Sequence, residues 1–141
     1  MPILTRRYND PAPRESGFRV LVCRFRPRGV RREDESWDVF WPNLGPSVDL
    51  HAAYYGKRGP PISWETYRVE YLRQMESQTW WIRALADRVR AGETISLLCS
   101  SACVDESRCH RSLLGGLIEE RLAPATPAAA SGKVIRRPRK A

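Results

Sequence analysis

Short apolar runs alternate along this chain with longer segments in which apolar residues recur every three to four positions. The apolar runs cover 2–5, 18–23 and 94–99, and their length and composition predict strands. The longer segments predict helices that bury one face, because this spacing returns side chains to the same side of a helix.

Residues typical of helix ends, together with the apolar spacing, predict five helices along the chain. Ser47 and Ser63 are suited to cap helix N-termini, and Gly92 is suited to follow a C-terminus. An aromatic stripe recurs in the helix that Ser63 opens, and we interpret it as core packing. The expected helices cover 33–40, 47–55, 63–75, 79–91 and 105–122.

Strands separated by helices are typical of an α/β fold, and 141 residues are the size of one domain. We therefore predict a single small α/β domain with a mainly parallel sheet flanked by helices. The domain is expected over 1–123. The remaining residues, 124–141, have few bulky apolar side chains and are expected to form a basic, disordered tail.

Charge and hydropathy narrow the class of protein. The net charge is +8, but five of the cations lie within 133–140, and without them it falls to +3. This tail is either a solvated charge run or a contact for nucleic acid. No apolar run is long enough to span a membrane or resembles the apolar part of a signal peptide, so we expect a cytoplasmic protein with reduced or metal-bound cysteines.

The densest chemistry lies between Cys99 and Arg111, where three of the four cysteines and one of the two histidines fall within twelve residues. Cys99 ends an apolar run, and Cys109 and His110 directly follow the first turn of an expected helix. Free N–H groups and nearby cations there stabilise a thiolate. Cys99, Cys109 and His110 are therefore candidate catalytic residues, although Cys109 could equally be a small core residue.

Metal binding is a rival use of the same residues. The pattern Cys99-x3-Cys103-x5-Cys109-His110 offers four potential donors. If two strand ends converge, Cys23 could take the place of the fourth ligand. Closed zinc sites usually take their ligands as two close pairs, however, and adjacent residues on a helix point about 100° apart. We therefore assign no metal ligand and predict no particular cofactor from the sequence.

Arginines that follow the second apolar run form a candidate anion site. Arg24 and Arg28 flank a Pro-Gly turn, and guanidinium groups bind phosphate or carboxylate bidentately. With Arg111 they are our candidate substrate-binding residues, although a solvated charge run explains the first two equally well. Sites in parallel sheets lie beyond the carboxyl ends of strands, so we expect the ends at Cys23 and Cys99 to meet.

Three segments, taken together, resemble one family, the YeaO-like proteins of domain-of-unknown-function family 488 (DUF488). The first is Arg19-Val20-Leu21-Val22-x-Arg24-x-x-Pro27-Arg28-Gly29. The second combines Leu44-Gly45-Pro46-Ser47-x-x-Leu50 with Ser63-Trp64-Glu65-x-Tyr67-x-x-x-Tyr71, and the third ends in Cys109-His110-Arg111-Ser112-Leu113-Leu114.

This resemblance covers about residues 1–122 and implies a small α/β domain of bacterial or archaeal cytoplasm with no established activity. The polar residues that this chain shares with the family are Arg24, Arg28, Cys99, Cys109, His110 and Arg111. Two positions depart from the family pattern: many relatives have an aromatic residue in place of Arg26, and some have an acid in place of Cys23.

Three functions remain open at this point. The leading hypothesis is an enzyme that acts on a small anionic substrate, phosphorylated or nucleotide in character, through thiol, imidazole and guanidinium groups. The alternatives are a non-catalytic module that binds nucleic acid or protein, and a domain stabilised by a metal ion. The sequence excludes Walker, dinucleotide-binding, nucleophile-elbow and Cys-x5-Arg motifs.

Overall fold

The computed structural model describes residues 2–123, so the tail expected over 124–141 lies outside the described residues. Four parallel strands form one sheet in the spatial order β1-β4-β2-β3. Their bounds are β1 Ile3–Arg7, β2 Phe18–Leu21, β3 Val39–Phe40 and β4 Ile95–Cys99. The prediction of a single α/β domain with a parallel sheet is confirmed.

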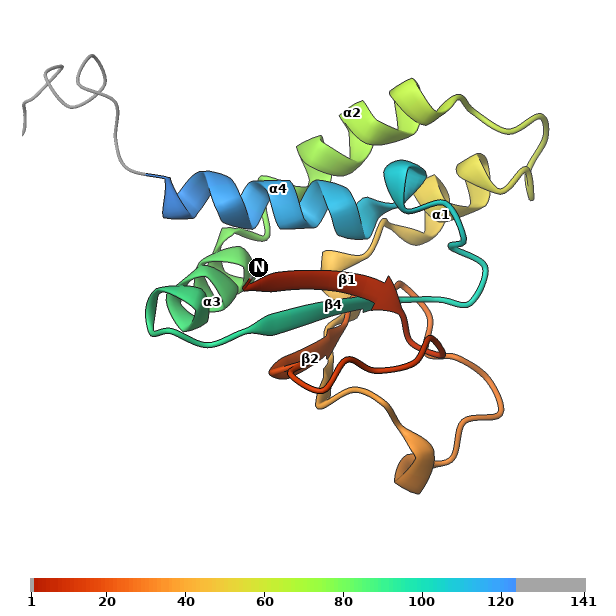
Figure 1. The fold of residues 1–141 in the computed structure, drawn as a ribbon. Coiled ribbons are helices and arrows are strands. Elements are labelled where there is room, and N and C mark those ends of the chain that lie inside the picture. Colours follow the sequence, from red (N-terminus) through yellow and green to blue (C-terminus); the bar gives the residue numbers. More distant parts are fainter. Residues whose placement is uncertain (1, 124–141) are drawn as a thin grey trace, which may run out of the picture.

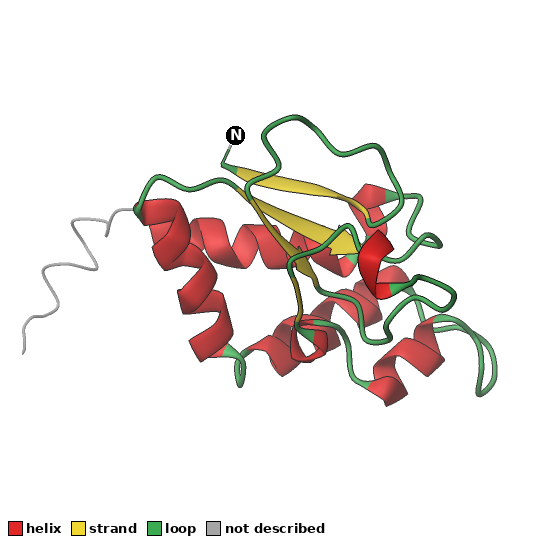
Figure 2. Ribbon diagram, turned by 90° about the horizontal axis from the view of Figure 1, so that it is seen from below, coloured by secondary structure: helices red, strands yellow, loops and turns green. Residues whose placement is uncertain are grey.

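The four α-helices within residues 2–123 lie on one side of this sheet, and loops lie on the other (Figures 1 and 2). The helices are α1 Val48–Tyr54, α2 Trp64–Met75, α3 Thr79–Arg90 and α4 His110–Leu122. Among the described residues, no helix is both long and apolar enough to cross a bilayer.

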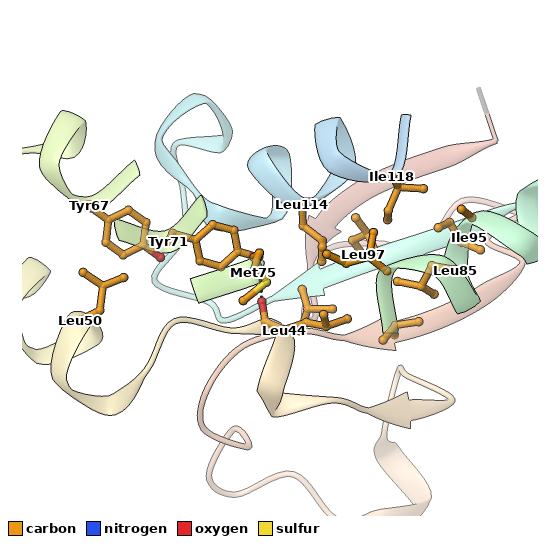
Figure 3. Close-up of a cluster of buried hydrophobic side chains, with 14 residues drawn as sticks. Leu44, Leu50, Tyr67, Tyr71, Met75, Leu85, Ile95, Leu97, Leu114 and Ile118 are labelled. Atoms are coloured by element: carbon orange, nitrogen blue, oxygen red, sulfur yellow. Dashed lines mark hydrogen bonds between the residues drawn. The ribbon is translucent and has the colours of Figure 1, made fainter. Parts of the chain in front are cut away.

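The main core lies between the sheet and the helices (Figure 3). Leu97 of the central strand packs there with Leu114 and Ile118 of α4, and all three side chains are inaccessible to solvent. Tyr71 of α2 lies deeper toward α1, and its hydroxyl donates a hydrogen bond to the Leu44 carbonyl at 2.8 Å. This bond anchors α2 to the turn that precedes α1.

A second, smaller cluster lies at the carboxyl edge of the sheet and on its loop-covered face. It joins Leu21 and Leu98 from adjacent strands to Trp37 of the long loop before β3. Three of the four cysteines, Cys23, Cys99 and Cys109, are buried members of the same cluster. The candidate chemistry therefore lies beside an apolar layer rather than on an open surface.

Local capping explains why two of the helices begin where the sequence predicts. The Ser47 side chain accepts a hydrogen bond from the Leu50 N–H, and the Ser63 side chain accepts one from the Thr66 N–H. Each bond satisfies a donor that a helix start leaves free. Gly92 follows α3 with φ +94°, a conformation that suits glycine.

The helix expected over 33–40 is wrong. The segment forms a single 3-10 turn over Arg32–Asp34 and then the two-residue strand β3. Salt bridges explain the turn, since Arg31 pairs with Asp34 and Arg26 pairs with Glu35. The rest of the segment is held by the β2 edge, where the Trp41 N–H donates to the Leu21 carbonyl at 2.9 Å.

The helix expected over 105–122 is correct only in its second part. Asp105 caps a separate 3-10 turn over Glu106–Arg108, accepting a hydrogen bond from the Ser107 N–H. Cys109 then adopts an extended conformation with φ −132° and ψ 142°, and α4 begins at His110. Cys109 is thus the N-cap residue of α4 and does not lie inside its first turn.

Candidate functional site

The carboxyl ends of β2 and β4 meet, as the strand-end argument predicts. The Val22 N–H donates to the Leu98 carbonyl at 2.9 Å, which continues the pairing one residue beyond β2. A pocket of about 70 Å³ opens at this junction. Its lining includes Cys23, Arg24, His51, Tyr55, Tyr67, Cys99, Cys103 and His110.

Three thiols gather at the floor of this region. The Sγ atoms of Cys99 and Cys103 are 3.1 Å apart, and those of Cys99, Cys103 and Cys109 all lie within 4.8 Å of one another. We call these three side chains the thiol cluster. Cys99 comes from the end of β4, Cys103 from the following loop and Cys109 from the start of α4, so the cluster joins three consecutive elements.

His110 is held beside the thiol cluster by a buried hydrogen bond. Its Nε2 lies 2.8 Å from the Val22 carbonyl oxygen, which can only accept, so Nε2 carries a proton. Nδ1 faces the thiols and lies 4.0 Å from the Cys99 Sγ. In the neutral imidazole, this tautomer leaves a lone pair on Nδ1 that can accept a proton or bind a metal ion.

The backbone of Cys109 explains how two adjacent residues reach one cluster. Neighbouring side chains on a regular helix diverge by about 100°. Because Cys109 is extended and only His110 is helical, their side chains both turn toward Cys99. The sequence argument against a shared role for these neighbours assumed that both were helical, and that assumption is wrong.

Hydrogen bonds among the three thiols shift their pKa values in opposite directions. Hydrogen bonds from Cys109 and Cys99 lower the pKa of the Cys103 thiol well below its ordinary value. The contact with Cys103 raises the pKa of both Cys99 and Cys109, and burial adds to the effect. Burial alone would lower the pKa of His110, but its contacts with Cys109 and the Val22 carbonyl raise it.

Cys23 lines the pocket but is separate from the thiol cluster. Its Sγ donates to the Phe25 carbonyl at 3.1 Å, and burial raises its pKa to about 12. The sulfurs close enough to share a metal ion are those of the thiol cluster, without Cys23. The strand ends do converge, yet the Cys23 side chain does not join the candidate ligands.

The three candidate arginines occupy different environments. Arg24 lines the pocket, and its Nε donates to the Pro46 carbonyl at 2.7 Å. Arg28 is exposed in the turn and is not part of the pocket lining. Arg111 is 4% exposed and lies behind the cluster, where its Nη2 donates to the Cys103 carbonyl at 3.3 Å.

Close packing of backbone keeps Arg24 in place. The turn at Gly45 approaches the end of β2 so closely that a Cβ on this glycine would lie 2.7 Å from the Arg24 backbone nitrogen. Only a residue without a side chain allows this approach. The Arg24 side chain then crosses to the Pro46 carbonyl on the far side of the turn.

Three residues at this site were not among the predicted site residues. Cys103 was considered only as a potential metal donor, and no role was assigned to His51 or Tyr55. Tyr55 places its hydroxyl 3.8 Å from the Cys103 Sγ, and the His51 ring packs 4.6 Å from the Tyr55 ring between centroids. Clustering of cysteines was a usable signal for Cys103, whereas nothing local marks α1 as a wall of the pocket.

Comparison with known proteins places the chain in a family. A family model described as the active DUF488-N3 subclade matches residues 3–122, which covers the whole described domain apart from its two ends. The chain belongs to the DUF488 family. The resemblance inferred from the motifs is thereby confirmed.

A curated relative supports the same membership. The chain is 31% identical over 101 residues to "Uncharacterized protein YeaO" of Escherichia coli (strain K12), and the match covers 72% of this chain and 84% of that protein. No solved structure matches the chain. Membership of DUF488 thus agrees with the fold, and the chemistry has to be argued from the site itself.

Proposed function

We propose that this DUF488 protein is an enzyme that acts on a small anionic substrate in the pocket at the carboxyl ends of β2 and β4. The observation that carries the proposal is the convergence of thiols, imidazole and guanidinium on one pocket from parts of the chain about 75 residues apart. The family model's description of its subclade as active agrees with an enzyme.

The residues have distinct roles in this proposal. Cys103 is the reacting thiol, because it lines the pocket and is the least buried member of the thiol cluster. His110 accepts and returns a proton through Nδ1, with its tautomer fixed by the Val22 carbonyl. Cys99 and Cys109 act on the reacting thiol as hydrogen-bonding neighbours rather than as nucleophiles.

Arg24 supplies the contact for the substrate's negative charge. Its Nε is bound to the Pro46 carbonyl, and its Nη groups have no partner within residues 2–123. Arg28 and Arg111 have no direct place in this contact, since neither lines the pocket. Free thiols need a reducing compartment, so the proposal includes a cytoplasmic location.

Alkylation with two reagents of similar shape and different charge tests the proposal. The protein, freshly reduced in the presence of a chelator, is treated with iodoacetate or iodoacetamide, and modified cysteines are mapped by mass spectrometry while circular dichroism monitors the fold. We expect Cys103 to react first. A charge contact of about 1 kcal/mol with Arg24 should favour the anionic reagent roughly 5-fold, relative to a simple thiol.

Matched variants make the result specific. Arg24→Gln should abolish the preference for iodoacetate, whereas Arg28→Gln, in the same turn but outside the pocket, should retain it. Equal rates with both reagents in the unmodified protein would refute the anionic substrate. A first reaction at Cys23 would refute the assignment of the reacting thiol.

A further inference from the structure

The three sulfurs of the thiol cluster lie close enough together to bind one metal ion. Three sulfurs lie within 4.8 Å of one another, and the closest pair is separated by 3.1 Å. Tetrahedral zinc with Zn–S bonds of about 2.3 Å holds its sulfurs about 3.7–3.8 Å apart. The closest pair is nearer than this value and all three sulfurs lie within 4.8 Å of one another, so small side-chain rotations would bring them onto one ion.

His110 lies beside the three sulfurs and is not one of the clustered donors. Its Nδ1 lies 4.0 Å from the Cys99 Sγ, but among the described residues the donors that all lie within 4.8 Å of one another are the three sulfurs. Its other nitrogen is bound to the Val22 carbonyl, so Nδ1 keeps a lone pair next to the cluster. His110 therefore keeps its role as proton carrier and is not a proposed ligand.

We propose that Cys99, Cys103 and Cys109 together bind a zinc ion. Zinc sites with three protein ligands leave the fourth tetrahedral position to a water molecule or a substrate. The inference rests on the proposed function for the position of the active site, and it names the cofactor of that site. Bound to zinc, Cys103 stays a thiolate at neutral pH while it lines the pocket.

Charge balance around the cluster supports a dication. Three thiolates around one zinc ion carry one net negative charge, which is costly to bury without a counter-ion. Arg111, at 4% exposure, donates to the Cys103 carbonyl, and its Nε and Nη1 are buried without a hydrogen-bond partner. A fixed positive charge at this position would compensate a negatively charged zinc centre.

Metal content and thiol protection measured on the same sample provide the test. Full-length protein, purified without chelator or reductant, should contain close to one zinc ion per chain by mass spectrometry of the metal. Ellman's reagent should detect the three cluster thiols only after a chelator has been added. Replacement of zinc by Co²⁺ should give the intense visible absorption of tetrahedral cobalt with thiolate ligands.

The cysteines of this chain provide a matched control. Cys103→Ser changes a partly exposed loop residue and should weaken zinc binding by more than the roughly 10–100-fold that loss of an outer-sphere partner costs. Cys23→Ser changes a buried cysteine of the same apolar cluster that is not a proposed ligand, and it should retain the zinc. If Cys99→Ser fails to fold, the comparison of these two variants still decides the question.

Two outcomes would overturn the inference. One is metal-free protein whose cluster thiols react without a chelator. The other is masked thiols that a reductant releases and a chelator does not, which would indicate a disulfide between Cys99 and Cys103. Either outcome leaves the alkylation experiment on Arg24 intact, whereas zinc binding without a charge preference there would reject the anionic substrate and keep the metal.

Discussion

Removing the hydroxyl of Tyr71 tests how the core supports the pocket. This hydroxyl donates to the Leu44 carbonyl at 2.8 Å, and both residues are fully buried. Tyr71→Phe keeps the ring and its packing but leaves that carbonyl without a partner. An unsatisfied buried polar group costs about 1–3 kcal/mol, so we expect the free energy of unfolding to fall by that amount.

A neighbouring tyrosine provides the control. Tyr67 lies one turn earlier on α2, with its ring stacked 6.3 Å from that of Tyr71, and is equally shielded at 3% exposure. Its hydroxyl makes no hydrogen bond to any residue within 2–123, and the residue lines the pocket. Tyr67→Phe therefore removes an oxygen without leaving a buried partner behind, and we expect a change below about 0.5 kcal/mol.

Urea denaturation followed by circular dichroism measures both variants. The midpoint should fall for Tyr71→Phe with an unchanged denaturant slope, because the surface exposed on unfolding stays the same. In thermal unfolding, the loss corresponds to roughly 3–5 °C per kcal/mol for a domain of this size. Equal stabilities for the two variants would refute the claim that the Tyr71 bond anchors the turn before α1.

Four further substitutions separate packing from propensity. Gly45→Ala should reduce the free energy of unfolding by about 1–3 kcal/mol and so lower the melting temperature, because the new Cβ would lie 2.7 Å from the Arg24 backbone nitrogen. Gly115→Ala should instead stabilise by about 0.5–1 kcal/mol in urea denaturation, since its Cβ would meet only ordinary contacts at 3.8 and 3.9 Å inside α4. Trp81→Ala should cost about 3 kcal/mol or more because this ring packs on the core, whereas Trp80→Ala, at 67% exposure, should change thermal stability by less than about 0.5 kcal/mol.

Local patterns predicted most of the fold because burial and capping are local properties. β4 is buried at every position and reads as an apolar run, and the serines before α1 and α2 cap them as expected. The prediction for the segment 33–40 was wrong because a strand of two residues has too few positions to show an alternation of apolar and polar side chains. Its conformation depends on the edge of β2, which the segment's own sequence does not contain.

The location of the candidate site could be predicted from the sequence, but not all of the residues that form it. Parallel strands present their carboxyl ends at one edge, which brought Cys99 close to Val22 and, through the start of α4, to His110. The inclusion of Cys103 depends on the conformation of a loop. The approach of the neighbours Cys109 and His110 to one cluster depends on the extended backbone of Cys109, and composition encodes neither of these. For the same reason, Arg24 and Arg28 were indistinguishable in sequence although only the first lines the pocket.

The strand order has a consequence for how the chain is made. Among the strands of residues 2–123, β4 is the last to be synthesised, yet it is the one that pairs with both β1 and β2. A nascent chain that ends before residue 95 therefore has no partner for β1, and its cysteine-bearing loop has not yet emerged. Because these contacts are distant in sequence, we expect folding to wait for the final third of the chain and then to complete the sheet and the thiol cluster in one cooperative step.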